Sequence, residues 1–297
     1  MIVFGGHQGY VSTNEVWVLS IGEDPHWTPL LPAGSPPAAR SQAAAIFDPL
    51  RDRMILFGGS WDADYEDEVM YGDTWSLELD PAPRWVQLST AGTLPPRCKG
   101  ASAVYDPFSD RMVLFGGWTG VSGLNARTLN DTWTLTLSGE PRWDRLAASN
   151  APPERQETAA VVDTRRRRMI VSGGNGWQWS HTMNDTWALP LDGTAVPTWT
   201  RLPTGDQGRS VDQHAAIYSP ERDALVQYGG EGAGNLCFEL ELQRNEWSQV
   251  NSDVTGPFPI RRVLPTLIAD PVQPRLRLFG GGWGCKHDFW EMALDDP

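Results

Sequence analysis

The side chains best suited to move a proton stand at similar places in a repeating pattern. Glu157, Asp212, His214 and Lys99 each lie just before a run of small and β-branched residues that is typical of a β-strand. Carboxylate, imidazole and amine groups are the ones that proteins use for general acid–base catalysis. Because a strand needed only for packing gains nothing from a charge at its start, we take these four residues as candidates for acid–base chemistry.

A second group of candidates is aromatic and basic. Five of the 15 tryptophans come within five residues after a Gly-Gly pair, and large aromatic side chains on loops commonly mark recognition surfaces. Several arginines fall eight or nine residues before an aspartate or its equivalent, and a guanidinium binds carboxylate or phosphate through paired hydrogen bonds and stacks on indoles. Together with two residues that directly follow a glycine pair, the ligand-binding candidates are Trp61, Trp118, Trp177, Trp179, Trp283, Arg40, Arg97, Arg155, Arg262, His7 and Glu231.

The elements that position these residues follow from an internal repeat. Most glycine pairs are followed by an alternating segment built on Asp-x-Trp, as in Asp73-Thr74-Trp75, and then by a second tryptophan. Alternation with period two predicts half-buried strands, and four short strands in about 50 residues make one blade of a β-propeller. The first glycines of the pairs are 51 to 58 residues apart, and the six pairs stand at residues 5–6, 58–59, 116–117, 173–174, 229–230 and 280–281.

The repeat resembles a known family. The glycine pair, the aromatic residue after it and the later tryptophan are similar to the kelch repeat, and the form Asp-Pro-x-x-Asp-Arg-Met-x-Leu-Phe-Gly-Gly at 48–59 resembles the long kelch repeats of bacterial proteins. The resemblance covers essentially the whole chain. It implies one domain, residues 1–297, with an all-β fold: a six-bladed kelch-type propeller of four-stranded antiparallel blades. It implies little about function, because one fold of this kind serves many activities.

The two ends of the chain depart from the ideal repeat. The chain begins within the second strand of the first unit and stops after the third strand of the sixth, so we expect the first and last blades to be incomplete. Either the natural chain is longer, or the ring is open with unpaired strand edges that need a partner. The expected assembly is therefore a monomer, or a dimer joined through the incomplete blades.

Antiparallel pairing explains why the candidates should meet. The start of the first strand and the end of the second strand lie at the same face of a blade. In kelch propellers the first strand is innermost, so the resemblance implies that both candidate groups ring the mouth of a central channel. The loops after the glycine pairs hold 8, 13, 13, 10, 5 and 6 residues, which predicts a wall on blades two to four and an asymmetric cleft.

Each kind of candidate also has a structural interpretation that the sequence leaves open. A tryptophan after a glycine pair can plug the channel or pack on the neighbouring blade. The arginines can form ion pairs between blades with framework acids. Many relatives read Arg-x-Gly-His before the first strand, so His214 can simply keep the family histidine and hydrogen-bond a neighbouring blade.

Composition argues against several classes of partner. A formal charge of −13 repels phosphate backbones and anionic lipids, so we expect neither nucleic acid nor a membrane as a partner. The arginine run at 165–168 stands where other units have a tight turn, and a solvated hairpin explains it. The sequence shows no signal peptide, and Cys98, Cys237 and Cys285 form no Cys-x-x-Cys pair, so a cytoplasmic location fits. No metal or cofactor is expected, because the copper and iron ligand series of similar propellers have no match here.

Three functions remain open. The leading one is the binding of a small molecule or peptide, aromatic or anionic, at a mouth lined by tryptophan and arginine. The alternative is a cofactor-free enzyme, an isomerase, cyclase or lyase in which Glu157, Asp212 or His214 moves a proton while the indoles stabilise a cationic intermediate. The third is a protein-interaction scaffold, although no BTB or F-box module accompanies the repeats. The sequence by itself does not decide whether a reaction is catalysed.

Overall fold

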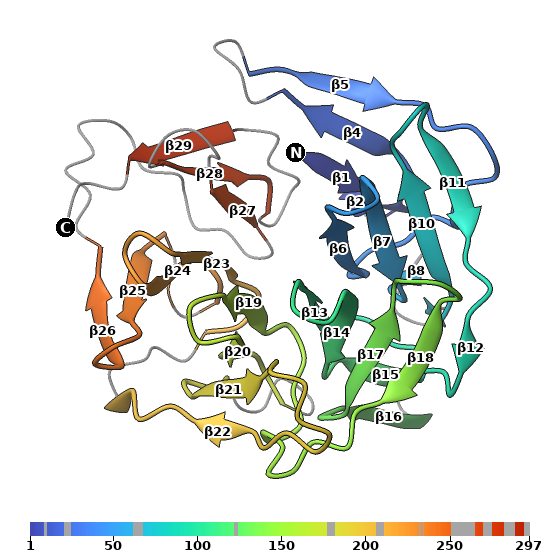
Figure 1. The fold of residues 1–297 in the computed structure, drawn as a ribbon. Coiled ribbons are helices and arrows are strands. Elements are labelled where there is room, and N and C mark those ends of the chain that lie inside the picture. Colours follow the sequence, from blue (N-terminus) through green and yellow to red (C-terminus); the bar gives the residue numbers. More distant parts are fainter. Residues whose placement is uncertain are drawn as a thin grey trace. The chain divides into compact units, whose positions relative to one another are not determined.

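The described part of the chain is built from β-strands. In the computed structural model it forms two compact units, Met1–Leu146 and Ala147–Pro297. Figure 1 shows strands joined by turns and loops, with no α-helix among the described residues. None of them forms a helix long and apolar enough to span a bilayer. The described residues are 1–8, 11–20, 25–61, 68–121, 124–176, 182–205, 211–231, 233, 235–250, 265–269, 275–281 and 289–293.

Besides three two-stranded hairpins, unit 1 contains three larger sheets, one for each of the first three repeats. The first sheet has the order β1 (Ile2–Phe4), β4 (Val16–Leu19), β5 (Trp27–Leu30). The second has, from its first strand outward, β6 (Ala44–Asp48), β7 (Arg53–Phe57), β10 (Thr74–Glu78) and β11 (Arg84–Gln87). The third has β13 (Ser102–Asp106), β14 (Arg111–Phe115), β17 (Thr132–Thr136) and β18 (Arg142–Arg145), with the short β12 (Ala91–Gly92) added in parallel to β18.

Unit 2 repeats the pattern in three further sheets. The fourth sheet has the order β19 (Ala159–Asp163), β20 (Arg168–Ser172), β21 (Thr186–Pro190), β22 (Thr200–Arg201). The fifth has β23 (Ala215–Ser219), β24 (Ala224–Tyr228), β25 (Cys237–Glu241) and β26 (Glu246–Gln249). The sixth has β27 (Thr266–Ala269), β28 (Arg275–Phe279) and β29 (Phe289–Ala293).

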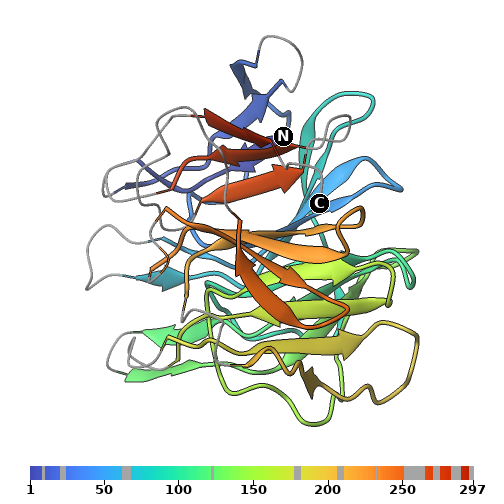
Figure 2. The same cartoon turned by 90° about the vertical axis from the view of Figure 1, so that its left-hand side faces the viewer.

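These six sheets are the blades of a six-bladed propeller, which confirms the predicted all-β fold class. Within unit 1 the first strands β6 and β13 contact each other, and within unit 2 β23 contacts both β19 and β27. Figure 2 shows the blades of unit 2, coloured from yellow-green to red, one after another. The first and last blades have three strands each among the described residues, as expected from the truncated repeats.

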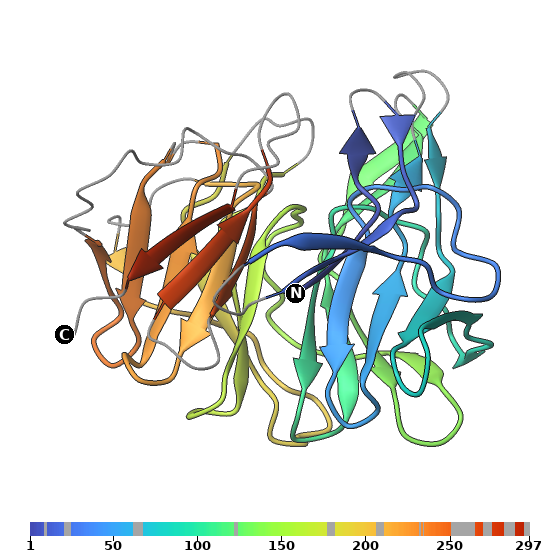
Figure 3. The same ribbon diagram turned by 90° about the horizontal axis from the view of Figure 1, so that it is seen from above.

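Short hairpins follow the glycine pairs of unit 1. In Figure 3 they project from one end of its sheets, opposite the turn between β6 and β7. The long loops predicted to build a wall are thus hairpins in the second and third blades, while residues 177–181 of the fourth loop lie outside the described part of the chain. The hairpins pair β2 (His7–Gln8) with β3 (Val11–Ser12), β8 (Ser60–Trp61) with β9 (Val69–Met70), and β15 (Trp118–Val121) with β16 (Leu124–Thr128).

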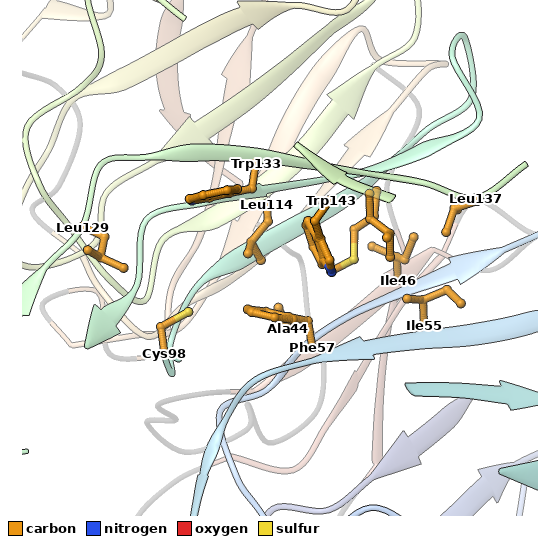
Figure 4. Close-up of a cluster of buried hydrophobic side chains, with 12 residues drawn as sticks. Ala44, Ile46, Ile55, Phe57, Cys98, Leu114, Leu129, Trp133, Leu137 and Trp143 are labelled. Carbon is orange, nitrogen blue, oxygen red and sulfur yellow. The ribbon is translucent and has the colours of Figure 1, made fainter. Parts of the chain in front are cut away.

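Tryptophans of the outer strands fill the space between blades in unit 1. Trp143 of β18 is fully buried, and its ring centroid lies 5.0 Å from that of Phe57 in the second blade. Its indole N–H donates to Thr74 Oγ1 of the second blade at 3.0 Å. Figure 4 shows this ring within a cluster drawn from both blades. Truncating such a ring to alanine costs roughly 3–5 kcal/mol, which accounts for the second tryptophan of the repeat.

The glycine pairs are junctions between successive blades. Gly58 has a φ of 69°, and a Cβ placed on it would lie 2.5 Å from the carbonyl oxygen of Cys98 in the next blade. Gly59 N–H donates to that same oxygen at 2.8 Å. The pair at 173–174 meets the carbonyl oxygen of Val211 in the same way. Glycine is needed because the next blade comes too close for any side chain.

Arginine–aspartate pairs join neighbouring blades at the opposite end, near the turns between the first and second strands. Arg51 in the β6–β7 turn lies 2.5 Å from Asp110 of the third blade. In unit 2, Arg166 lies 2.6 Å from Asp223 of the fifth blade. The arginine run at 165–168 does form the expected hairpin turn, with Arg165 and Arg167 exposed. Arg166 departs from the expectation because it joins two blades.

Candidate functional site

Main-chain bridges bring the two candidate segments together in blades two to five. In four blades, the residue shortly before the first strand pairs with the residue directly after the glycine pair. This confirms, blade by blade, that the start of strand one lies beside the end of strand two. A mouth shared by all six blades stays a prediction. The bridged pairs are Ser41 with Ser60, Lys99 with Trp118, Gln156 with Asn175, and Asp212 with Glu231.

The residue that follows the first member of each bridged pair has a left-handed backbone. Gln42, Glu157 and Gln213 have φ angles of 53°, 56° and 55°, and Gly100 has 62°. Glycine adopts this conformation freely, whereas a side chain there costs roughly 1–2 kcal/mol. Backbone conformation therefore explains the glycine of the Arg-x-Gly-His pattern. It does not explain the polar residues that replace glycine here.

In unit 2 a buried amide joins two carboxylates from neighbouring blades. Asn175, with no exposed surface, donates from Nδ2 to Glu157 Oε2 at 3.0 Å and to Asp212 Oδ2 at 2.7 Å. Gln213 Nε2 donates to the same oxygen of Glu157 at 3.0 Å. Gln156 Nε2 donates to Asn175 Oδ1 at 3.0 Å. We call these five residues the Asn175 cluster.

Two buried oxygens of the cluster are left over. Because the Nδ2 group of Asn175 faces the carboxylates, its oxygen faces Gln156, which must present its NH₂ group there. Gln156 Oε1 and Asp212 Oδ1 then have no hydrogen-bond partner among the described residues, although both side chains are only 3% exposed. A buried polar atom without a partner costs roughly 1–3 kcal/mol, so two in one cluster make it a candidate functional site.

His214 directly follows Gln213 in the chain and is also buried. Neither ring nitrogen has a hydrogen-bond partner among the residues described. The ring packs against the fourth blade at Gly173, where an added Cβ would lie 3.0 Å from its Cε1. The interpretation that His214 hydrogen-bonds a neighbouring blade is therefore not what the described contacts show. Burial lowers the pKa of His214 to about 4, so the imidazole is neutral at pH 7.

The titratable groups of the cluster are the carboxyl groups of Glu157 and Asp212, with Glu231 at its border. Burial raises the pKa of Asp212, and the charge of Glu231 raises it further, while the hydrogen bond from Asn175 acts in the opposite direction. Glu231 stays close because its N–H donates to the carbonyl oxygen of Asp212 at 3.0 Å. Buried carboxyl groups near one another either keep a proton or pair with a cation.

The arginines at the same place in the second and fourth blades belong to the framework. Arg40, only 1% exposed, donates to both oxygens of Asp73 at 2.6 and 3.0 Å, and Asp73 also accepts from Trp75 Nε1. Arg155 holds Asp185 in the same way, at 2.6 and 3.1 Å. Burial would raise the pKa of Asp185, but Arg155 outweighs it and the pKa lies below its usual range. Each pair lies within one blade, so the expected pairing between blades is corrected.

The third blade lacks this pair. Lys99 is the bridging residue, so Cys98 occupies the arginine position and Arg97 stands one residue too early, with an exposed side chain. The equivalence of Arg97 with the other arginines is therefore wrong. Asp131, which begins the Asp-x-Trp motif here, pairs with Arg145 instead. Burial raises the pKa of the Cys98 thiol to about 12, which suits a packing role.

The other candidates do not join the Asn175 cluster in the described contacts. Lys99 forms an ion pair with Glu68 in the second blade's loop. Trp61 and Trp118 are half-buried in their hairpins, and His7 is exposed in β2. Four candidates lie outside the described residues: Trp177, Trp179, Trp283 and Arg262.

Three members of the cluster, Asn175, Gln156 and Gln213, were not among the sequence candidates. The signal for Asn175 is its place directly after a glycine pair, where His7 and Glu231 also stand. Gln156 follows the framework residue Arg155, and its sequence context carries no comparable signal.

Comparison with known proteins agrees with the architecture. The sequence profile of the KLHDC2/KLHL20/DRC7 kelch-repeat domain matches residues 1–230. The chain belongs to the kelch-repeat family. It is similar to a solved kelch-type structure described as "Structure of YjhT", with a TM-score of 0.72 over 99% of this chain and 94% of that one. At 14% sequence identity, this likeness shows the kelch propeller fold alone.

Two curated relatives are much longer proteins. The leucine-zipper-like transcriptional regulator 1 homolog of Drosophila melanogaster is 26% identical over 95% of this kelch chain. Adagio protein 3 of Arabidopsis thaliana is 28% identical over 63% of it. The chain spans only 28% and 27% of the lengths of these relatives.

Proposed function

We propose that this kelch propeller binds a small molecule or a peptide through the Asn175 cluster of unit 2. The observation that carries the proposal is the pair of buried oxygens, Asp212 Oδ1 and Gln156 Oε1, without partners among the described residues. A blade does not need such a network to fold, because the second blade has Ser41 and Gln42 at the equivalent positions. The propeller framework therefore does not require these side chains at these positions, which leaves them available for binding.

The framework use of two arginines bears on the class of ligand. Arg40 and Arg155 are buried and paired with aspartates, so their charges are already used. The prediction of an anionic ligand rested on a ring of arginines that included both. The acidic character of the Asn175 cluster favours a ligand that donates hydrogen bonds.

Acid–base catalysis at the same cluster is a second candidate function. The observation that favours it is the raised pKa of Asp212 beside the neutral imidazole of His214, since perturbed titratable groups gather at catalytic sites. An isomerase or lyase needs a group that can accept a proton and return it near neutral pH. Catalysis would require the same ligand position as simple binding, so one screen addresses both.

The test is a thermal-shift and tryptophan-fluorescence screen of metabolites and short peptides against the full chain. Binding at the cluster predicts a saturable response that Glu157→Gln weakens and that Glu246→Gln, an exposed change in the fifth blade, leaves intact. A response that survives Glu157→Gln unchanged would contradict the site. A screen without any saturable response would contradict the function and favour a folded protein as partner.

The same ligands decide between binding and catalysis. NMR spectra of each bound compound, recorded over time with the protein, show whether it is converted. Conversion that Asp212→Asn abolishes while binding persists is the expected result for an enzyme. A ligand that remains unchanged supports a binding protein.

A further inference from the structure

The unpartnered atoms of the Asn175 cluster are both acceptors. Asp212 Oδ1 carries part of a negative charge, and Gln156 Oε1 is an amide oxygen. The companion atom of each is bonded to the amide of Asn175: Asp212 Oδ2 accepts from its nitrogen, and Gln156 Nε2 donates to its oxygen. A ligand group that meets these two oxygens must therefore bring hydrogen-bond donors.

Building on the proposed function, we propose that the group received here is a primary ammonium of the ligand, held between Asp212 Oδ1 and Gln156 Oε1. An ammonium has three donors and no acceptor, so it satisfies both oxygens without adding an unpaired acceptor of its own. Its charge also pairs with the carboxylate, which makes the hydrogen bond to Asp212 charge-assisted.

The charges around the site agree with a cation and disagree with an anion. Three carboxyl groups, those of Glu157, Asp212 and Glu231, meet at the cluster or border it. His214, the neighbouring titratable base, is buried and neutral at pH 7. An anionic ligand would face these carboxylates, and Arg155, next to Gln156 in the chain, already pairs with Asp185.

Glu157 supports the assignment because its backbone conformation and the burial of its carboxylate are both unfavourable. It occupies a left-handed position, with a φ of 56°, that glycine fills in the third blade. Its carboxylate is buried and accepts hydrogen bonds from both Asn175 and Gln213. A strained, buried carboxylate beside a second one makes a site selective for positive charge.

An ammonium can come from a free amine or from a lysine side chain, and paired probes distinguish the two sources. Benzylamine represents a small amine, and N-acetyl-lysine methylamide represents a lysine in a peptide. Their neutral counterparts are benzyl alcohol and N-acetyl-norleucine methylamide. Calorimetric titration of the full chain with each of the four compounds, up to about 10 mM, covers sites with millimolar dissociation constants.

We expect at least one cationic probe to bind, with its neutral counterpart about tenfold weaker or silent. Asp212→Asn, which keeps the shape and can still accept from Asn175, should weaken the cationic probe by about tenfold or more. Glu246→Gln should leave binding unchanged. Circular dichroism and thermal melting of both variants establish that each is folded.

Several results would overturn the assignment. Equal binding of a cationic probe and its neutral counterpart would show that the site does not recognise the positive charge. Binding that survives Asp212→Asn would place the ammonium elsewhere, and silence of both cationic probes would remove it altogether. If other compounds of the screen bind through Glu157 while both amines are silent, the proposed function stands and only the ammonium assignment fails.

Discussion

Replacing the first glycine of a pair tests whether the pair is a junction between blades. Gly58 and Gly139 both have a φ of 69°. An added Cβ would lie 2.5 Å from the oxygen of Cys98 at Gly58, but would meet nothing within 4 Å at Gly139. Gly139→Ala should therefore lose about 1–2 kcal/mol, the cost of left-handed backbone alone. Gly58→Ala should lose about 2–4 kcal/mol more, because the oxygen must move and its 2.8 Å hydrogen bond from Gly59 weakens.

Urea unfolding measures the difference between the two alanine variants. Circular dichroism and tryptophan fluorescence must give coincident transitions, since only then are the free energies of unfolding comparable. Equal losses in both variants would refute the junction, because they would show that backbone conformation alone requires glycine at Gly58. A larger loss at Gly139 than at Gly58 would refute it as well.

Two further predictions concern unit 2. Arg155→Met should lower the free energy of unfolding by about 3–5 kcal/mol, because Asp185 stays buried without its partner, and adding Asp185→Asn should restore most of the loss; a double variant no more stable than the single one would contradict the pairing. Because burial lowers the pKa of His214 from 6.5 to about 4, its contribution to stability is complete above about pH 6.5 and is lost as the pH falls toward 4. His214→Gln should flatten that part of the stability curve, and a His214 proton signal that titrates near pH 6.5 in NMR spectra would argue against its burial.

Local pattern was sufficient for the architecture and for part of the site. Alternation and the recurring glycine pair predicted the strands, the blades and the three-stranded ends, because these depend on neighbours along the chain. The antiparallel order of strands one and two predicted that residues before the first strand would meet those after the glycine pair. Glu157 and Asp212, found this way, do share the amide of Asn175.

The sequence pattern did not show which partner a given side chain would contact. Arg40 lies eight residues before Asp48 and Arg97 lies nine before Asp106. In the structure Arg40 is buried on Asp73, whereas Arg97 is exposed and Cys98 occupies the arginine position. The sequence contained this one-residue difference, but it did not show that the buried position would hold an ion pair with the aspartate of the same blade. The framework use of Arg40 was therefore visible only in the structure.

The sequence by itself determined that this chain is a kelch propeller of six blades and that charged residues stand at the ends of its first strands. It could do so because backbone hydrogen bonding and the burial of alternating apolar side chains repeat at a fixed period. Only the tertiary structure decided which charged side chains form ion pairs within the framework and which meet in the Asn175 cluster. Asn175 lies 37 residues from Asp212 in the chain, and their contact exists because two neighbouring blades bring the side chains within 2.7 Å.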